Sequence, residues 1–148
     1  MSDLNKDIRW KQRFQNYRRA FNLLRSALEE RELDKYSPLE QEGIIQRFEY
    51  TFELGWKTLK DYLEFSGVAI TEVTPRRVIK ECAALGIFND AGIEGDIYLD
   101  MMLSRNALSH MYDLEQFAGV IAKIKSNYLH ELEKEYMFFM NKELDENG

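Results

Sequence analysis

Four side chains near the end of a predicted helix could together perform acid–base and phosphate chemistry. Arg105, Asn106, His110 and Tyr112 supply a guanidinium, an amide, an imidazole and a phenol within eight positions. On an ideal α-helix, at about 100° per residue, Asn106 and His110 share one face. Arg105 and Tyr112 share a second face about a quarter-turn away. We therefore expect all four groups to line one edge of a cleft.

The chemistry that such a set could perform is RNA cleavage without a metal ion. The imidazole of His110 can move protons near neutral pH. The guanidinium of Arg105 can bind a phosphate through two hydrogen bonds and stabilise the charge of a five-coordinate phosphorus. The 2′-OH of the RNA would be the nucleophile, and a dimer would supply a second His110. The alternative is that these residues are ordinary surface or capping groups.

Other catalytic patterns do not occur in the sequence. It contains no glycine-rich phosphate loop, no nucleophile elbow and no Cys/His cluster. No Glu stands three residues before His110 or His130, as a di-iron helical bundle would require. We therefore expect no metal and no cofactor. Cys82 is expected to be a small buried residue, and His130 to lie on the surface.

Two long helices are predicted in the first half of the chain. Apolar residues repeat at 4-3-4-3-4 spacing and predict a first helix of about six turns; they are Trp10, Phe14, Tyr17, Phe21, Leu24 and Leu28. Ser37, Pro38 and Glu40 then form a capping box that begins a second helix, and Gly67 is expected to cap its end. Gly55 costs up to about 1 kcal/mol inside this helix, which predicts close approach of another helix there.

The middle of the chain predicts shorter elements. Val68–Ile70 is expected to be an extended connection. A short helix is predicted from Arg76 to Leu85, closed by Gly86. Asn89–Gly92 has the composition of a loop.

Two further helices complete the predicted fold. One begins at about Glu94, and one follows Asp113 and runs toward the C-terminus. We expect an all-α protein, an antiparallel four-helix up-and-down bundle with one extra short helix. It should form a single domain over residues 1–148, with ends 1–6 and 143–148 frayed. The first and last helices carry more apolar surface than such a core needs, which favours a homodimer.

Composition and charge restrict the partners. The 148 residues have a net charge of −6, which argues against DNA and other broad nucleic-acid binding. Residues 1–25 nevertheless hold seven Lys and Arg against two Asp, a local charge of +5 that leaves −11 elsewhere. No apolar run approaches the ~18 residues of a membrane span. With a single Cys and no apolar leader, the sequence favours a cytoplasmic protein.

Several segments of the chain resemble a known family. The segment Arg105–Tyr112 is similar to the R-x4-H-x-Y signature of HepT-type proteins in the HEPN superfamily. Gln46–Leu63 resembles the second helix of the nucleotidyltransferase substrate-binding protein family, and Thr74–Glu81 and Asp100–Met102 are also similar to segments of that family. The resemblance runs from roughly the first helix to Tyr128.

The resemblance implies an all-α homodimer bound by a minimal nucleotidyltransferase, and two functions are described for such proteins. One is the substrate-binding subunit of a two-component nucleotidyltransferase. The other is a toxin ribonuclease, neutralised when the nucleotidyltransferase transfers AMP to the motif tyrosine. In the second case Arg105 and His110 would be catalytic, Asn106 would assist and Tyr112 would be the AMPylation acceptor. AMP on Tyr112 would place a charge where the RNA phosphate must bind.

Overall fold

The computed structural model describes residues 2–147, and side chains within residues 4–145. All regular elements in this range are helical, which confirms the all-α prediction. In chain order they are α1 (Ser2–Glu29), the 3₁₀ turn η1 (Leu33–Lys35), α2 (Pro38–Phe65), α3 (Pro75–Ala84), α4 (Ile87–Ala91), α5 (Gly95–Ala107), the 3₁₀ turn η2 (Leu108–His110), α6 (Leu114–Lys123), the π-helical segment η3 (Ile124–Tyr128) and α7 (Leu129–Asn147).

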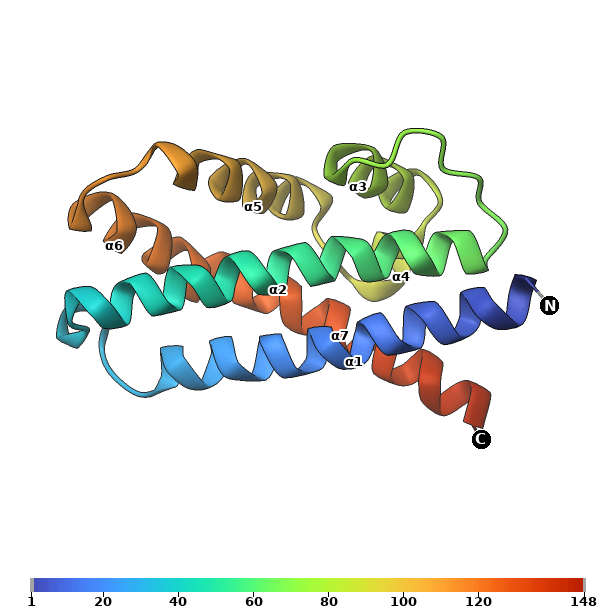
Figure 1. Cartoon of the computed structure of the whole chain (residues 1–148), viewed down its shortest axis with the longest axis horizontal. Helices are drawn as coiled ribbons and strands as arrows, with labels where there is room; N and C mark the ends of the chain where they lie inside the picture. The colour runs from blue at the N-terminus through green and yellow to red at the C-terminus, as the bar shows by residue number, and fades with distance from the viewer. Residues whose placement is uncertain (1, 148) are drawn as a thin grey trace.

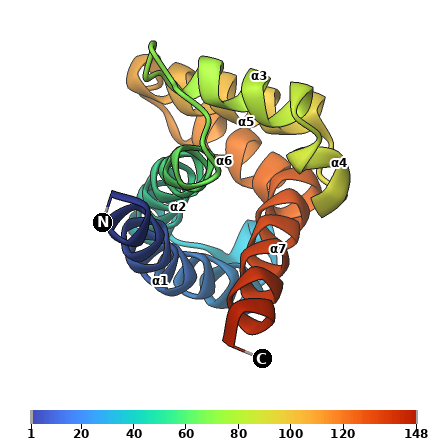
Figure 2. The same cartoon turned by 90° about the vertical axis from the view of Figure 1, so that its right-hand side faces the viewer.

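The long helices alternate in direction. Figure 1 shows α1 and α2 side by side and antiparallel, α5 running against α2, and α6 with α7 returning toward the C-terminus. Seen from the end, α7 faces the α1–α2 pair across the core (Figure 2). Helix covers residues 2–6 and 143–147, the ends that are predicted to fray, while Met1 and Gly148 lie outside the described residues. No helix in the described range is long and apolar enough to cross a membrane.

The local signals of the first two helices are confirmed. The apolar stripe of α1 is at most 1% exposed along its whole length. Ser37 Oγ accepts from the backbone N–H of Glu40 at 3.1 Å, and Ser37 N–H donates to Glu40 Oε1 at 2.9 Å, so the capping box is complete. Gly67 adopts φ +92°, the left-handed conformation of a helix-ending glycine.

Gly55 is a point of close approach between helices, as its position inside α2 predicts. A Cβ added there would lie 3.0 Å from Tyr98 Oη, 3.1 Å from Glu135 Oε1 and 3.1 Å from Tyr17 Cε1. These atoms come from α5, α7 and α1. Four helices therefore meet at a residue that has no side chain.

Helix α5, which carries the motif, is fastened along its length to the last part of the chain. Hydrogen bonds along the helix do this, among them Glu94 N–H to Glu131 Oε1 at 2.7 Å, Tyr98 Oη to Glu135 Oε1 at 2.6 Å, and Tyr128 Oη to Asp100 Oδ2 at 2.5 Å. The first also satisfies an N–H at the start of α5, where no side-chain cap from Glu94 itself is present.

One element differs from its prediction. Residues 89–92 are not a loop, because most of them belong to α4. Gly86 and Gly92 adopt φ +84° and +73° and limit this single turn at both ends. Phe88 is 2% exposed and anchors the turn in the core. Burial of one aromatic ring therefore outweighs the turn-forming composition of the segment.

Candidate active site

The motif spans the end of α5 and the turn that follows it. The α-helix ends at Ala107, residues 108–110 form the 3₁₀ turn η2, and Met111 is extended at φ −101° and ψ 135°. The expectation that the four groups share faces of one ideal α-helix is therefore wrong. The physical reason is the start of α6, where Gln116 Oε1 accepts from the backbone N–H of Tyr112 at 3.0 Å and draws the chain out of helix.

Arg105 lies against α2. Its Nη2 donates to Glu53 Oε2 at 2.8 Å, and its Cζ lies 5.9 Å from the ring centroid of Phe52. The side chain of Arg105 is 31% exposed, so one part of the guanidinium meets protein and another part meets solvent.

Arg105 and Asn106 share a surface pocket of about 480 Å³ with Glu49 and Ser109. Ser109 Oγ donates to the backbone carbonyl of Asn106 at 3.1 Å, which ties the turn to the last residues of α5. An anion in this pocket would meet a guanidinium and an amide from adjacent positions. The structure therefore brings two of the four predicted groups together.

His110 and Tyr112 are not among the residues that line this pocket. Both are exposed along the turn, and the exposed fraction of Tyr112 is 85%. The imidazole makes no hydrogen bond or ion pair with any side chain that the structure describes. Both groups are thus accessible to another molecule.

Glu53 is a site residue that sequence reasoning missed. Its carboxylate accepts from Trp56 Nε1 at 3.1 Å and lies 3.2 Å from Lys57 Nζ, besides its contact with Arg105. Burial raises the pKa of Glu53, but these hydrogen bonds and the nearby charges outweigh it, so the pKa lies below its usual range. The signal in the sequence is a Glu with Trp at i+3 and Lys at i+4 on one helix.

The basic residues of α1 do not contribute to the pocket, since none of its lining residues comes from that helix. Several of their charges are used elsewhere: Arg13 Nε lies 3.0 Å from Asp61 Oδ2, and the guanidinium of Arg18 stands over the ring of Tyr136. Arg25 Nη1 lies 3.9 Å from Glu133 Oε1.

The remaining predicted residues behave as structural groups. Cys82 is buried, and burial raises the pKa of its thiol well above the usual range, so it is a poor nucleophile at neutral pH. His130 lies at the surface and is exposed, as expected. Within the part of the chain that the structure describes, no group of three or more His, Cys, Asp or Glu is arranged to hold a metal ion.

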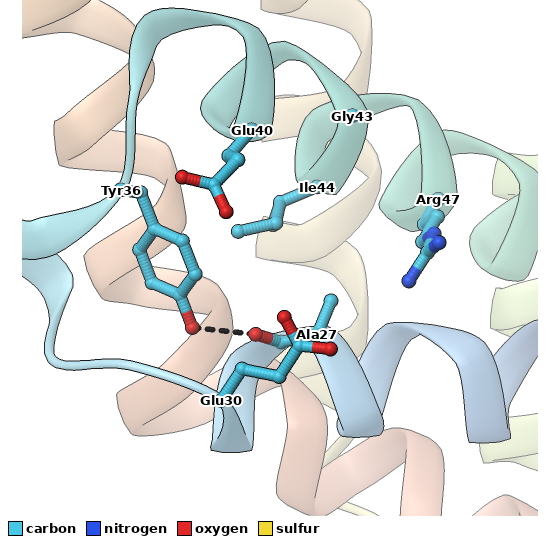
Figure 3. A pocket seen from close by; sticks show the side chains of 7 residues that line it. All are labelled: Ala27, Glu30, Tyr36, Glu40, Gly43, Ile44 and Arg47. Atoms are coloured by element: carbon cyan, nitrogen blue, oxygen red, sulfur yellow. Dashed lines mark hydrogen bonds between the residues drawn. The ribbon is translucent and has the colours of Figure 1, made fainter.

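A second pocket, of about 240 Å³, lies at the connection between α1 and α2 and contains no motif residue (Figure 3). Tyr36 Oη donates to the carbonyl of Ala27 at 2.5 Å and so satisfies one of the last carbonyls of α1. The side chains of Glu30, Glu40 and Arg47 surround the opening. The hydrogen bond from Tyr36 to Ala27 fastens the turn between the two long helices.

Comparison with known proteins places these observations in context. A family model described as "nucleotidyltransferase substrate binding protein like" matches residues 12–141. A protein of Haemophilus influenzae named "Probable ribonuclease HepT" is 31% identical over 85 residues, 55% of this chain and 56% of the relative, so the match spans about half of that relative. A crystal structure of a Thermus thermophilus protein is 30% identical, with a TM-score of 0.67 over 80% of this chain and 94% of that one.

Proposed function

We propose that this chain is a toxin ribonuclease. The premise is its family: the chain belongs to the nucleotidyltransferase substrate-binding protein-like family and is HepT-like, within the HEPN superfamily. The observation that carries the proposal is the pocket lined by Arg105 and Asn106, together with Ser109, which the exposed His110 follows directly in the chain. The name of the Haemophilus relative supports the same activity.

The proposed reaction needs no nucleophile from the protein. The 2′-oxygen of the RNA attacks the adjacent phosphorus and loses its proton, and the 5′-oxygen leaves and gains one. The products are a 2′,3′-cyclic phosphate and a 5′-hydroxyl. Arg105 would bind the phosphate and stabilise its added charge, Asn106 would assist in orienting it, and His110 would transfer a proton.

We further propose that the protein is a homodimer of HEPN-like four-helix bundles. A single chain holds His110 outside the pocket of Arg105, and one imidazole supplies only one proton-transfer group. A second copy would supply a second imidazole. The measurement that tests this is the molar mass in solution, and a purely monomeric active protein would contradict it.

The proposed control of the toxin is AMPylation of Tyr112 by a cognate minimal nucleotidyltransferase. The 85% exposure of this side chain supports the proposal, because a modifying enzyme needs access to the phenol oxygen. Co-expression with the nucleotidyltransferase should add the mass of one AMP to the wild type and to Tyr50→Phe, a control at a tyrosine that is 60% exposed. Tyr112→Phe should gain nothing, and an equal gain in that variant would contradict the proposal.

The second candidate is a non-catalytic substrate-binding subunit of a two-component nucleotidyltransferase. The description of the matching family favours it. It requires binding of the nucleotidyltransferase's substrate and no RNA cleavage, and it makes His110 dispensable.

RNA cleavage by the purified protein in the presence of a chelator separates the two functions. The ribonuclease proposal expects fragments that end in a 2′,3′-cyclic phosphate, and no cleavage of DNA of the same sequence, which has no 2′-OH. Intact RNA, or cleavage that requires added metal, would contradict it.

A further inference from the structure

We infer that Glu53 is a positioning residue that holds the guanidinium of Arg105 in the orientation in which it receives the RNA phosphate. The inference rests on the proposed function and deepens it. It concerns a residue of α2 that lies 52 positions from Arg105 in the sequence.

The carboxylate of Glu53 is itself held in place by its own helix. Glu53 Oε2 accepts from the indole Nε1 of Trp56 at 3.1 Å, and Glu53 Oε1 lies 3.2 Å from Lys57 Nζ. These donors stand three and four residues further along α2, so they meet Glu53 on one helix face. With each oxygen engaged, the carboxylate has little freedom to rotate, and the acceptor offered to Arg105 has a defined direction.

Arg105 is held at one edge and on one face. At its edge, the guanidinium donates from Nη2 to Glu53 Oε2 at 2.8 Å. Its face lies toward the ring of Phe52, with Arg105 Cζ 5.9 Å from the ring centroid. Phe52 is fully buried, and its ring lies 6.0 Å from that of Tyr98 in the core. The guanidinium therefore rests against a rigid part of the molecule.

The rest of the guanidinium remains available. Arg105 Nε and Nη1 make no hydrogen bond to any residue that the structure describes, and Arg105 lines the pocket with Asn106. A guanidinium presents its donors in a planar fork, so fixing one nitrogen also fixes the direction of the others. Lys57 balances the charge of Glu53, so the positive charge of Arg105 is left to face the pocket, where the carboxylate of Glu49 is the opposing charge.

Fixing the fork in advance should act mainly on the chemical step. An arginine that must find its orientation in each complex loses freedom as the transition state forms, and small misplacements reduce rates strongly. The opposite arrangement, in which Glu53 occupies the phosphate position and inhibits the site, predicts the reverse effect. A loss of kcat on removal of the carboxylate supports positioning, and a gain supports inhibition.

The test compares Glu53→Gln with Glu64→Gln by steady-state RNA cleavage. Glu64 is a matched control, because it lies on the same helix, also pairs with a lysine four positions away, at 3.1 Å from Lys60 Nζ, and makes no hydrogen bond or ion pair with Arg105 in the described structure. We expect Glu53→Gln to lower kcat by about 10- to 100-fold with little change in KM. We expect Glu64→Gln to keep wild-type values, and Glu53→Asp, which retains the charge on a shorter stem, to lie between.

Two further readouts separate this inference from the proposed function. Thermal unfolding checks that the variants are folded. Arginine side-chain NMR, recorded without RNA, should show slow rotation of the Arg105 guanidinium in the wild type and fast rotation in Glu53→Gln. Unchanged or increased kcat in Glu53→Gln, or unchanged Arg105 rotation, overturns the inference while leaving the ribonuclease proposal intact. A wild type that cleaves no RNA contradicts the proposed function, whereas the NMR comparison still decides whether Glu53 holds Arg105.

Discussion

Helix α5 belongs to two different environments. Toward its N-terminal end, Tyr98 is fully buried and donates to the equally buried Glu135 beside Gly55. At its C-terminal end, Arg105 is partly exposed and His110 and Tyr112, just beyond the helix, face solvent. One end is enclosed by three other helices, whereas at the other end the buried Ser104 and Leu108 still pack into the core and only the residues around them are exposed.

The difference indicates that stability and chemistry are separated along one helix. We call residues 55, 98 and 135, together with Tyr17, the buried junction, and residues 105–112 the motif segment. Changes in the buried junction should affect folding through packing and desolvation. Changes at the exposed or half-buried polar groups of the motif segment, Arg105, Asn106 and His110, should affect the reaction and leave the fold nearly unchanged, whereas Leu108 of the same segment belongs to the core. Substitutions in the two regions can therefore be set against each other.

The largest effect is expected in the motif segment. Arg105→Ala should lower the rate of RNA cleavage by about 100-fold or more, because a group that stabilises transition-state charge is lost. Its stability should change by less than about 1 kcal/mol, since the pair with Glu53 is partly exposed. Cleavage assays and urea unfolding on the same preparation check both parts. A variant that is strongly destabilised would show that the two regions are not separate.

The next effect lies in the buried junction. Gly55→Ala would place a Cβ 3.0–3.1 Å from atoms of Tyr98, Glu135 and Tyr17, all of which are enclosed. We expect the free energy of unfolding to fall by about 1–3 kcal/mol, as for other overpacked cores. Chemical denaturation measures it. A variant as stable as the wild type would mean that the helices can separate easily at this point.

Glu135 should make stability depend on pH. Burial raises the pKa of Glu135 well above its usual range, and the hydrogen bond from Tyr98 only partly opposes this. Because the pKa of Glu135 is higher in the folded state than in the unfolded state, its contribution to the free energy of unfolding is fully present below the unfolded-state pKa. This contribution is lost as the pH rises through the folded-state pKa. Glu135→Gln cannot ionise, so it should gain stability relative to the wild type as pH increases, by about 1.4 kcal/mol per unit of pKa difference.

Urea unfolding of the wild type and Glu135→Gln at pH 5 and at pH 8 measures this linkage. A stability difference between the two proteins that stays constant across the two conditions would mean that Glu135 keeps the same charge in the folded and unfolded states.

The smallest effect comes from a glycine in the same helix as Gly55 that no other group approaches. Gly43 has no atom within 4 Å of the position that a Cβ would take. Gly43→Ala should therefore raise the free energy of unfolding by up to about 1 kcal/mol, because alanine favours helix. Gly43→Ala and Gly55→Ala form a matched pair, because the same change of residue should raise the free energy of unfolding at one position and lower it at the other. Destabilisation at Gly43 would remove the contrast.

Local features of the fold could be predicted from the sequence. The capping boxes at Ser37 and Asp113, the stripe of α1 and the close approach at Gly55 depend on residues near one another or on one strong conformational rule. The turn at residues 87–91 was not predictable in this way, because burial of Phe88 depends on distant parts of the chain.

The geometry of the site depended on contacts that spacing does not reveal. The four motif groups have helical spacing, but the α-helix ends at Ala107, a 3₁₀ turn follows, and the backbone N–H of Tyr112 already bonds to Gln116 at the start of α6. The pairing of Glu53 with Arg105 joins residues of two helices, and the spacing of Trp56 and Lys57 marks Glu53 without indicating Arg105 as its partner. Residue types therefore indicated the chemistry, whereas tertiary structure decides which groups meet.

The central claim is that the motif segment cleaves RNA with His110 as a proton-transfer group. The most direct measurement is the cleavage rate of His110→Ala, in chelator, with and without added imidazole, to which the exposed site is accessible. We predict a loss of about 100- to 10,000-fold and partial recovery with imidazole. A rate equal to that of the wild type would contradict the account.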